Sequence, residues 1–135
     1  MLFKTSQNQR KVSEELTDIS GNSYSIFEMF KKDIFGSPKY KIDYISSNTF
    51  GLDFEADDEL IYATIEIRKK GLALYFRHRN EEYIVGSRFN QFSFLNNDGI
   101  FQVQMNSIQM KLRVSDLKGH KKFLKRLMRS RLESN

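Results

Sequence analysis

Residues 60–68 read Leu-Ile-Tyr-Ala-Thr-Ile-Glu-Ile-Arg, and this segment indicates the fold more clearly than any other. Its apolar residues recur at every second position. Successive side chains of a β-strand point to opposite faces of the sheet, so a period of two predicts a strand with one buried face. Residues 69–71 (Lys-Lys-Gly) make a tight connection to a second run, in which Leu72, Leu74 and Phe76 alternate with more polar neighbours. The two runs predict an antiparallel hairpin.

Similar alternating runs lie on both sides of this hairpin. We expect strands in residues 40–45, 49–54, 82–85, 89–95, 100–105 and 108–114. In the first of these, the alternation places Tyr40, Ile42 and Tyr44 on one face. Asp98-Gly99, between two such runs, is typical of a tight hairpin turn. Short strands joined by tight turns predict a mostly β fold with some α, an antiparallel meander of about seven strands that forms a barrel or bent sandwich.

The last part of the chain changes from a period of two to a helical period. Ser115 or Asp116 can cap this helix, and its apolar residues, from Leu117 to Met128, form one stripe. We expect the helix to close one end of the β structure. The expected core combines its inward residues with those of the strands: Ile61, Ile65, Ile67, Leu72, Leu74, Phe76, Phe101, Val103, Met110, Leu112, Phe123, Leu124 and Leu127.

Residues 1–39 are interpreted as a helical or irregular N-terminal segment, and residues 40–135 as the β domain with its helix, within a single domain overall. Apolar residues at i, i+4 and i+7 in residues 12–19 predict a first helix. Ser23 can cap a second helix that carries Phe27, Phe30 and Ile34 on one face. Residues 1–10 show no apolar pattern, which predicts a frayed end.

Composition excludes several classes of protein. The chain has 135 residues, 39% of them hydrophobic and 29% charged, which is typical of a globular domain. It has no cysteine and two histidines, which excludes a disulfide scaffold, a thiolate zinc site, a cysteine nucleophile and a histidine-rich metal site. No apolar stretch approaches the length of a signal peptide or a membrane span, so we expect a cytoplasmic location.

Positive charge is concentrated at the C-terminal end. The chain carries a formal net charge of +5. Residues 117–135 hold seven Lys or Arg against one Glu, a formal charge of +6, which leaves −1 for residues 1–116. Such asymmetry permits binding of an anionic partner, and it is equally compatible with a solvated helix face.

The predicted architecture, about seven antiparallel strands followed by one amphipathic helix, resembles the pleckstrin-homology superfold and is similar especially to small bacterial members of the pleckstrin-homology-like domains. Members that bind phosphoinositides often carry a lysine near the end of one strand and a pair of basic residues on the next. Here Lys69 and Lys70 precede Arg77 and Arg79. The resemblance implies an anion-binding site at these four residues, with Arg77 and Arg79 on one strand face. The chain departs from eukaryotic members in having no tryptophan.

Candidate catalytic groups are few. His78 lies between two arginines, and we interpret it as structural; His120 we interpret as a surface or boundary residue. The acidic residues 57–59 are interpreted as a solvated turn, because they lack the glycine of a calcium loop. No nucleophile–base pair can be assembled from these residues, so we expect no enzyme activity, no catalytic residue, no metal and no cofactor.

Two kinds of function remain open. The first is a non-enzymatic binding or assembly module, whose partner would be another protein, a second copy of the chain or an anionic lipid headgroup. The second is a small nucleic-acid-binding domain that uses the C-terminal helix and the strand carrying Arg77 and Arg79. Phe89, Phe92, Phe94 and Phe101 crowd one hairpin, and the alternation puts Phe89 on the face opposite Phe92 and Phe94. Aromatic side chains left outside could stack on bases or dock on a protein.

Overall fold

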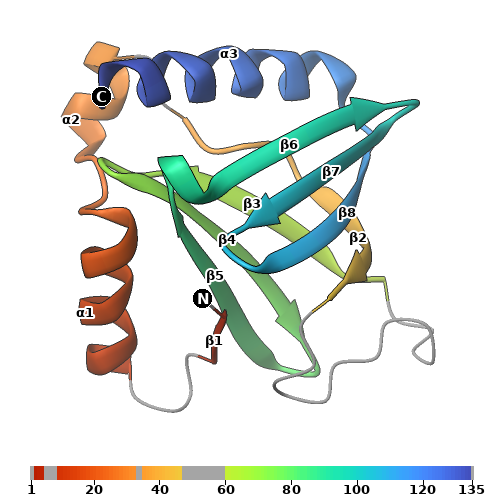
Figure 1. Cartoon of the computed structure of the whole chain (residues 1–135), viewed down its shortest axis with the longest axis horizontal. Coiled ribbons are helices and arrows are strands. Elements are labelled where there is room, and N and C mark those ends of the chain that lie inside the picture. The colour runs from red at the N-terminus through yellow and green to blue at the C-terminus, as the bar shows by residue number, and fades with distance from the viewer. Residues whose placement is uncertain (1, 5–8, 33–34, 47–59, 135) are drawn as a thin grey trace.

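The computed structural model describes residues 2–4, 9–32, 35–46 and 60–134. In these residues, eight strands form one antiparallel sheet in the order β1-β5-β4-β3-β2-β8-β7-β6 (Figure 1). The strands are β1 (Leu2–Lys4), β2 (Tyr40–Ile45), β3 (Tyr62–Ile67), β4 (Gly71–His78), β5 (Glu81–Arg88), β6 (Phe92–Asn97), β7 (Ile100–Met105) and β8 (Ile108–Val114). The helices are α1 (Gln9–Ser20), α2 (Ile26–Lys32) and α3 (Leu117–Glu133), with a 3₁₀ turn η1 at Phe89–Gln91.

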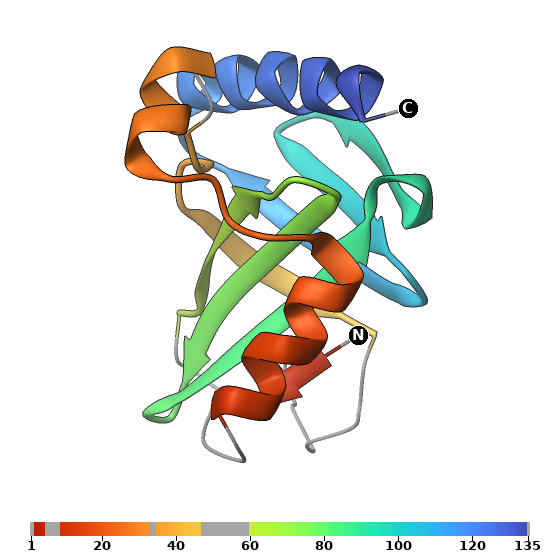
Figure 2. The same cartoon turned by 90° about the vertical axis from the view of Figure 1, so that its left-hand side faces the viewer.

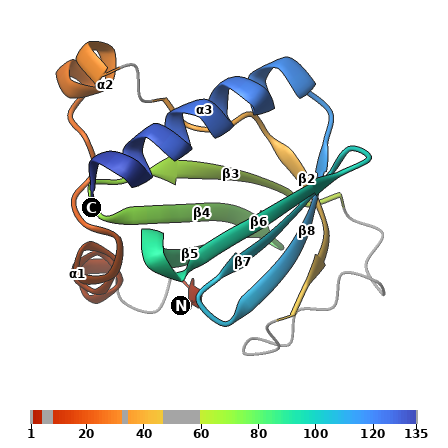
Figure 3. The ribbon, with the colours of Figure 1, turned by 45° about the horizontal axis from the view of Figure 1, so that its top comes forward.

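The sheet curls into a half-barrel, and α3 lies across one end of it (Figures 1 and 3). α1 packs on the outer face of β4 and β5 (Figure 2). Val12 and Leu16 of α1 form a second, smaller core there with Ala73 and Ile84. The predicted fold class, a mostly β antiparallel meander with a C-terminal helix, is therefore confirmed.

The main core fills the inside of the half-barrel and contains the residues that alternation predicted. Twelve of the thirteen expected core residues are buried, and Leu124 is half-buried against the same cluster. The central hairpin is also as expected, because Ile65 of β3 pairs with Leu74 of β4 in the antiparallel register. At the Asp98-Gly99 turn both residues have positive φ, which a tight hairpin of this type requires.

The regular alternation of inward and outward side chains is interrupted at two places that the sequence pattern does not reveal. In β2 the register with β8 shifts between Ile42 and Tyr44, so Ile45 is buried and Tyr44 is exposed. One extra residue in a strand reverses the direction of every side chain that follows, which explains the difference.

The second interruption of the alternation lies between β5 and β6. The 3₁₀ turn η1 resets the chain direction there, so Phe89, Phe92 and Phe101 are all buried and Phe94 is half-buried against the same core. The expected placement of Phe89 on the face opposite Phe92 and Phe94 is thus wrong, and these aromatic residues pack the core.

The N-terminal segment differs from the predicted frayed end. Residues 2–4 form β1, which pairs with β5 through Leu2 and Val85 among others. The predicted strand at residues 49–54, the acidic turn at 57–59 and Ile34 lie outside the described residues.

Candidate binding surface

The position of α3 is set by its buried stripe and by its N-cap. Phe123 and Leu127 are completely buried in the half-barrel. The Asp116 carboxylate accepts a hydrogen bond from the backbone N–H of Gly119 at 2.9 Å, so Asp116, one of the two predicted residues, is the cap. This stripe fixes which side of α3 points away from the barrel.

His120 connects α3 to two distant strands. It is buried, and its Nε2 lies 2.9 Å from Asn96 Oδ1 in β6, while its Nδ1 lies 2.6 Å from the Tyr40 hydroxyl in β2. Because the amide oxygen only accepts, Nε2–H donates to Asn96 and Nδ1 accepts from Tyr40. Both hydrogen bonds therefore suit a neutral imidazole, and burial lowers the pKa of His120 below its usual value. The expectation of a surface or boundary histidine is wrong, because the side chains that bury His120 come from residues far away in the sequence.

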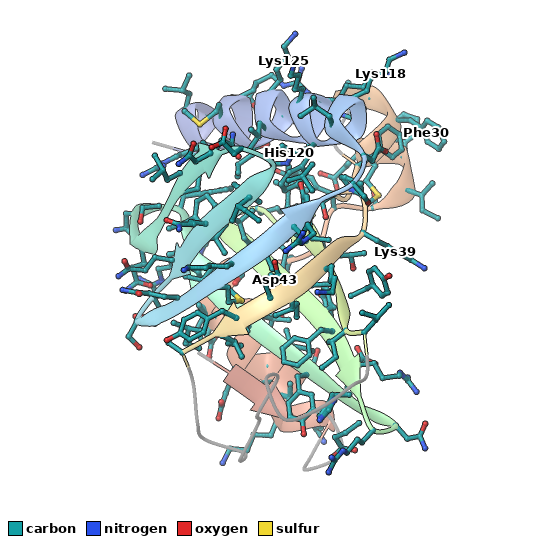
Figure 4. All side chains as sticks on the ribbon, turned by 90° about the vertical axis from the view of Figure 1, so that its right-hand side faces the viewer. Phe30, Lys39, Asp43, Lys118, His120 and Lys125 are labelled. Atoms are coloured by element: carbon teal, nitrogen blue, oxygen red, sulfur yellow. The ribbon has the colours of Figure 1, made fainter. Side chains whose placement is uncertain are left out.

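The outward side of α3 is basic. Lys118, Lys121, Lys122 and Lys125 are exposed, and Figure 4 shows Lys118 and Lys125 projecting away from the barrel. Within the described part of the chain, none of these four ammonium groups has a carboxylate within 4.0 Å. Four positive charges without a countercharge on one helix side raise the local potential and attract anions.

α2 presents apolar side chains to solvent. Ile26, Phe27 and Phe30 are 74%, 75% and 71% exposed. The helix begins with a capping box, in which the Ser25 hydroxyl accepts from the N–H of Glu28 and the Glu28 carboxylate accepts from the N–H of Ser25, each at 3.2 Å. Ser25, and not the predicted Ser23, is thus the cap.

α2 and the C-terminal half of α3 lie at the same end of the molecule (Figures 1 and 3). The guanidinium of Arg126 in α3 lies over the Phe35 ring at 5.3 Å, and this ring also contacts Phe30 edge-on, with ring centroids 5.5 Å apart. We give the name end surface to the exposed apolar residues of α2 together with the exposed lysines in the first half of α3: Ile26, Phe27, Phe30, Lys118, Lys121, Lys122 and Lys125.

The four residues of the sequence-predicted anion site are not brought together. Lys69 and Lys70 precede β4, whereas Arg77 lies near the other end of this strand, about 20 Å away at 3.3 Å per residue. Arg79 lies beyond β4, in the tight turn with positive φ, so it does not continue the strand face of Arg77. Two of the four also have acidic partners: Lys69 Nζ is 3.6 Å from Glu28, and Arg77 is 3.8 Å from Glu82.

A shallow hollow of about 250 Å³ surrounds Arg77 on the outer face of the sheet. Tyr62, Tyr75 and Glu82 are among its lining residues. Tyr75 donates a hydrogen bond of 2.6 Å to Glu66, and the charges of Arg77 and Glu82 largely cancel. Among the described residues, the positive charge of the end surface has no such compensation, so this surface is the stronger candidate for an anionic partner.

Sequence reasoning identified the basic helix but missed the apolar half of the end surface. Phe27 and Phe30 share a helix side, as expected, and such pairs are normally buried. The Ser25-x-x-Glu28 capping box is visible in the sequence and places the helix start correctly. No local signal shows that this helix side faces solvent.

Other classes of site are not found in the described ranges of the chain. No group of three or more acidic or histidine side chains there could hold a metal ion, and no helix there is long and apolar enough to cross a membrane. Comparisons with protein-family models, curated proteins and solved structures found no match. Functional inference therefore depends on the surface itself.

Proposed function

We propose that the chain is a non-enzymatic binding module of the pleckstrin-homology-like kind, which engages an anionic partner through its end surface. The observation that carries the proposal is the row of four exposed lysines on α3 without acidic partners among the described residues. The row lies opposite the buried stripe, so the helix can bind outward without losing its contacts with the barrel.

Two further features support this proposal. The strand order β5-β4-β3-β2-β8-β7-β6, with a C-terminal helix across one end, fits the architecture that the pleckstrin-homology resemblance implies. His120 is engaged by Tyr40 and Asn96, which gives it a structural role. A rigid scaffold with a charged outer face is suited to binding.

Retention on a heparin column tests which surface meets a polyanion. We compare the full chain with Lys118→Gln/Lys122→Gln/Lys125→Gln and with Lys70→Gln/Arg77→Gln/Arg79→Gln, which removes the same charge from the sequence-predicted site. The first variant is expected to elute at clearly lower salt and the second close to the parent chain. Equal shifts in both variants would show that only net charge matters and would overturn the proposal.

A nucleic acid is the alternative anionic partner, favoured by the same four lysines. Neutralising Z phosphates of duplex DNA gives a slope of about −0.9Z in a plot of log affinity against log salt. A slope close to −4 for a duplex oligonucleotide, lost in the α3 variant, would support this alternative. Fluorescence anisotropy of a labelled duplex measures it.

A further inference from the structure

We propose that the outer face of β2, β8, β7 and β6 carries a second binding site, which takes a neutral saccharide. The site is a hollow of about 300 Å³ whose lining residues come from all four strands. α1 packs on β4 and β5, near the opposite end of the strand order, so it does not cover the hollow. The hollow shares no residue with the end surface, so its ligand lies beyond the proposed function.

A first row of outward side chains crosses the four strands. Its members are all exposed, and the strand register places them side by side as the pairs Tyr44–Lys111, Lys111–Gln102 and Gln102–Leu95. Opposite side chains on one sheet face stand about 5 Å apart, and three strand spacings span about 14 Å. An apolar side chain therefore stands at each end of the row, and polar groups lie between the two ends.

A second row adds two more amides and a hydroxyl group. Gln109 of β8, Gln104 of β7 and Ser93 of β6 face one another in the same register, two residues along each strand from the first row. Gln104 Nε2 donates to the backbone carbonyl oxygen of Asn106 at 3.2 Å, which leaves the Gln104 amide oxygen to accept from a ligand. The two rows together hold three primary amides.

A β-bulge turns Tyr44 toward the hollow. The register of β2 with β8 shifts between Ile42 and Tyr44. Without this shift Tyr44 would point inward with Tyr40 and Ile42, which are buried. Bulges are frequent beside functional sites, where they re-aim a side chain. Tyr44 is 44% exposed, so its ring can offer a face to a ligand.

The charge of the hollow favours a neutral ligand. Lys111 is the single charged residue among the described residues that line it. The neighbouring cations Lys41 and Arg113 both contact the carboxylate of Asp43, at 2.8 and 2.9 Å, and Figure 4 labels Asp43 on this side of the molecule. A ligand with several negative charges would therefore meet one ammonium group here, whereas the end surface offers four.

The lining matches the chemistry of a sugar ring. A hydroxyl group both donates and accepts hydrogen bonds, and a primary amide carries two donor hydrogens and one acceptor oxygen, so one amide can pair with two neighbouring hydroxyls. The apolar C–H face of the ring can lie on Tyr44, and Leu95 can contact a second apolar group. The volume of the hollow is at the lower end of the range for small-molecule sites, which suits a short oligosaccharide.

Two other classes of ligand satisfy only part of this lining. A single-stranded nucleic acid could stack a base on Tyr44, but each nucleotide adds a phosphate, and Lys111 is the one cation in the described lining. An extended peptide gains much of its affinity by adding a strand to the edge of a sheet, whereas the hollow lies on the face of the strands. A neutral saccharide uses the amides and the aromatic ring together.

Binding of neutral oligosaccharides to the full chain tests the proposal. The probes are cellotriose, maltotriose and chitotriose, which present hydroxyl groups alone or together with acetamido groups. We expect saturation-transfer NMR to show binding of at least one probe, with the strongest transfer to the C–H protons of one ring face. Backbone amide shifts of the isotope-labelled parent chain should change around Tyr44, Gln102 and Lys111, and this map requires no variant.

Matched variants identify the residues that bind. Tyr44→Ala should lower the affinity about tenfold or more, and Gln102→Ala about fivefold. The controls Tyr62→Ala and Gln91→Ala remove an exposed tyrosine and an exposed glutamine outside the hollow, and they should bind like the parent chain. Unchanged affinity in Tyr44→Ala, or an equal loss in Tyr62→Ala, would contradict the proposed site.

Salt dependence separates this site from the end surface. Sugar binding should be the same at low and high salt and in Lys118→Gln/Lys122→Gln/Lys125→Gln, because a neutral ligand has no charge to screen. If no probe binds at millimolar concentration, the saccharide site is refuted and the proposed function stands. If sugar binds but heparin retention ignores the α3 lysines, the proposed function alone fails. Tighter binding of a single-stranded oligonucleotide at Tyr44 than of any sugar would overturn the saccharide assignment in favour of a nucleic acid.

Discussion

Mild acid should weaken the fold through His120. This imidazole is buried and neutral, and protonating Nδ1 would remove its ability to accept from the Tyr40 hydroxyl. Burial lowers the pKa of His120 in the folded state, whereas the unfolded chain has a histidine pKa of about 6.5. Between these two values the unfolded state binds a proton that the folded state does not. The contribution of His120 to the free energy of unfolding is therefore fully present above about pH 6.5, and it is lost as the pH drops toward the folded pKa.

The size of this fall in stability corresponds to one proton that the unfolded chain binds and the folded chain does not. The free energy of unfolding should fall by up to about 1.4 kcal/mol per pH unit within this window, and the fall should stop below the folded pKa of His120. Two carboxyl groups contribute only at lower pH. The pKa of Glu28 is lowered chiefly by the hydrogen bond from the Ser25 backbone N–H. Burial raises the pKa of Asp43, but the hydrogen bonds from Lys41 and Arg113 outweigh burial, so the pKa of Asp43 is lowered. Their stabilisation is lost below about pH 4.5.

Urea unfolding followed by circular dichroism measures this dependence, since the chain lacks tryptophan fluorescence. The series runs from pH 7.5 to about pH 5. His78→Gln leaves His120 as the single histidine and should keep the slope, whereas His120→Gln should remove it. If His120→Gln does not fold, the imidazole titration of His78→Gln by NMR gives the folded pKa directly. A pKa at or above 6.5 for His120 in that variant, or an unchanged slope in His120→Gln, would contradict the prediction.

Two further predictions concern packing. Leu127→Ala should lower the free energy of unfolding by about 2–5 kcal/mol because Leu127 is fully buried, and Leu124→Ala by clearly less because Leu124 is half-buried; equal losses in urea titrations would contradict this. Gly71→Ala should cost about 3 kcal/mol or more, because the new Cβ would lie 1.9 Å from the Ser87 carbonyl oxygen. Gly99→Ala, which meets no atom within 4 Å but has a φ of +79°, should cost only about 1–2 kcal/mol in the same assay.

Most of the strands and of the core can be predicted from local sequence patterns. Ile61, Ile65 and Ile67 are buried as their spacing predicts, because alternation is a local property that survives in any sheet with one buried face. The Asp98-Gly99 turn and the Asp116 cap follow equally from local chemistry. Prediction from alternation fails where one extra residue in a strand reverses the direction of the side chains that follow, as at Asp43 in β2.

Which helical residues are buried and which are exposed could not be predicted from the sequence, because this depends on how the elements pack together. His120 lies on a basic helix, yet Tyr40 and Asn96, which are 80 and 24 residues away in the chain, make its burial possible. Phe27 and Phe30 have the composition of core residues, yet they are exposed, because Phe123 and Leu127 of α3 already fill that end of the half-barrel. Burial depends on which surfaces remain open after the other elements have packed, and a spacing pattern within one segment contains no such information.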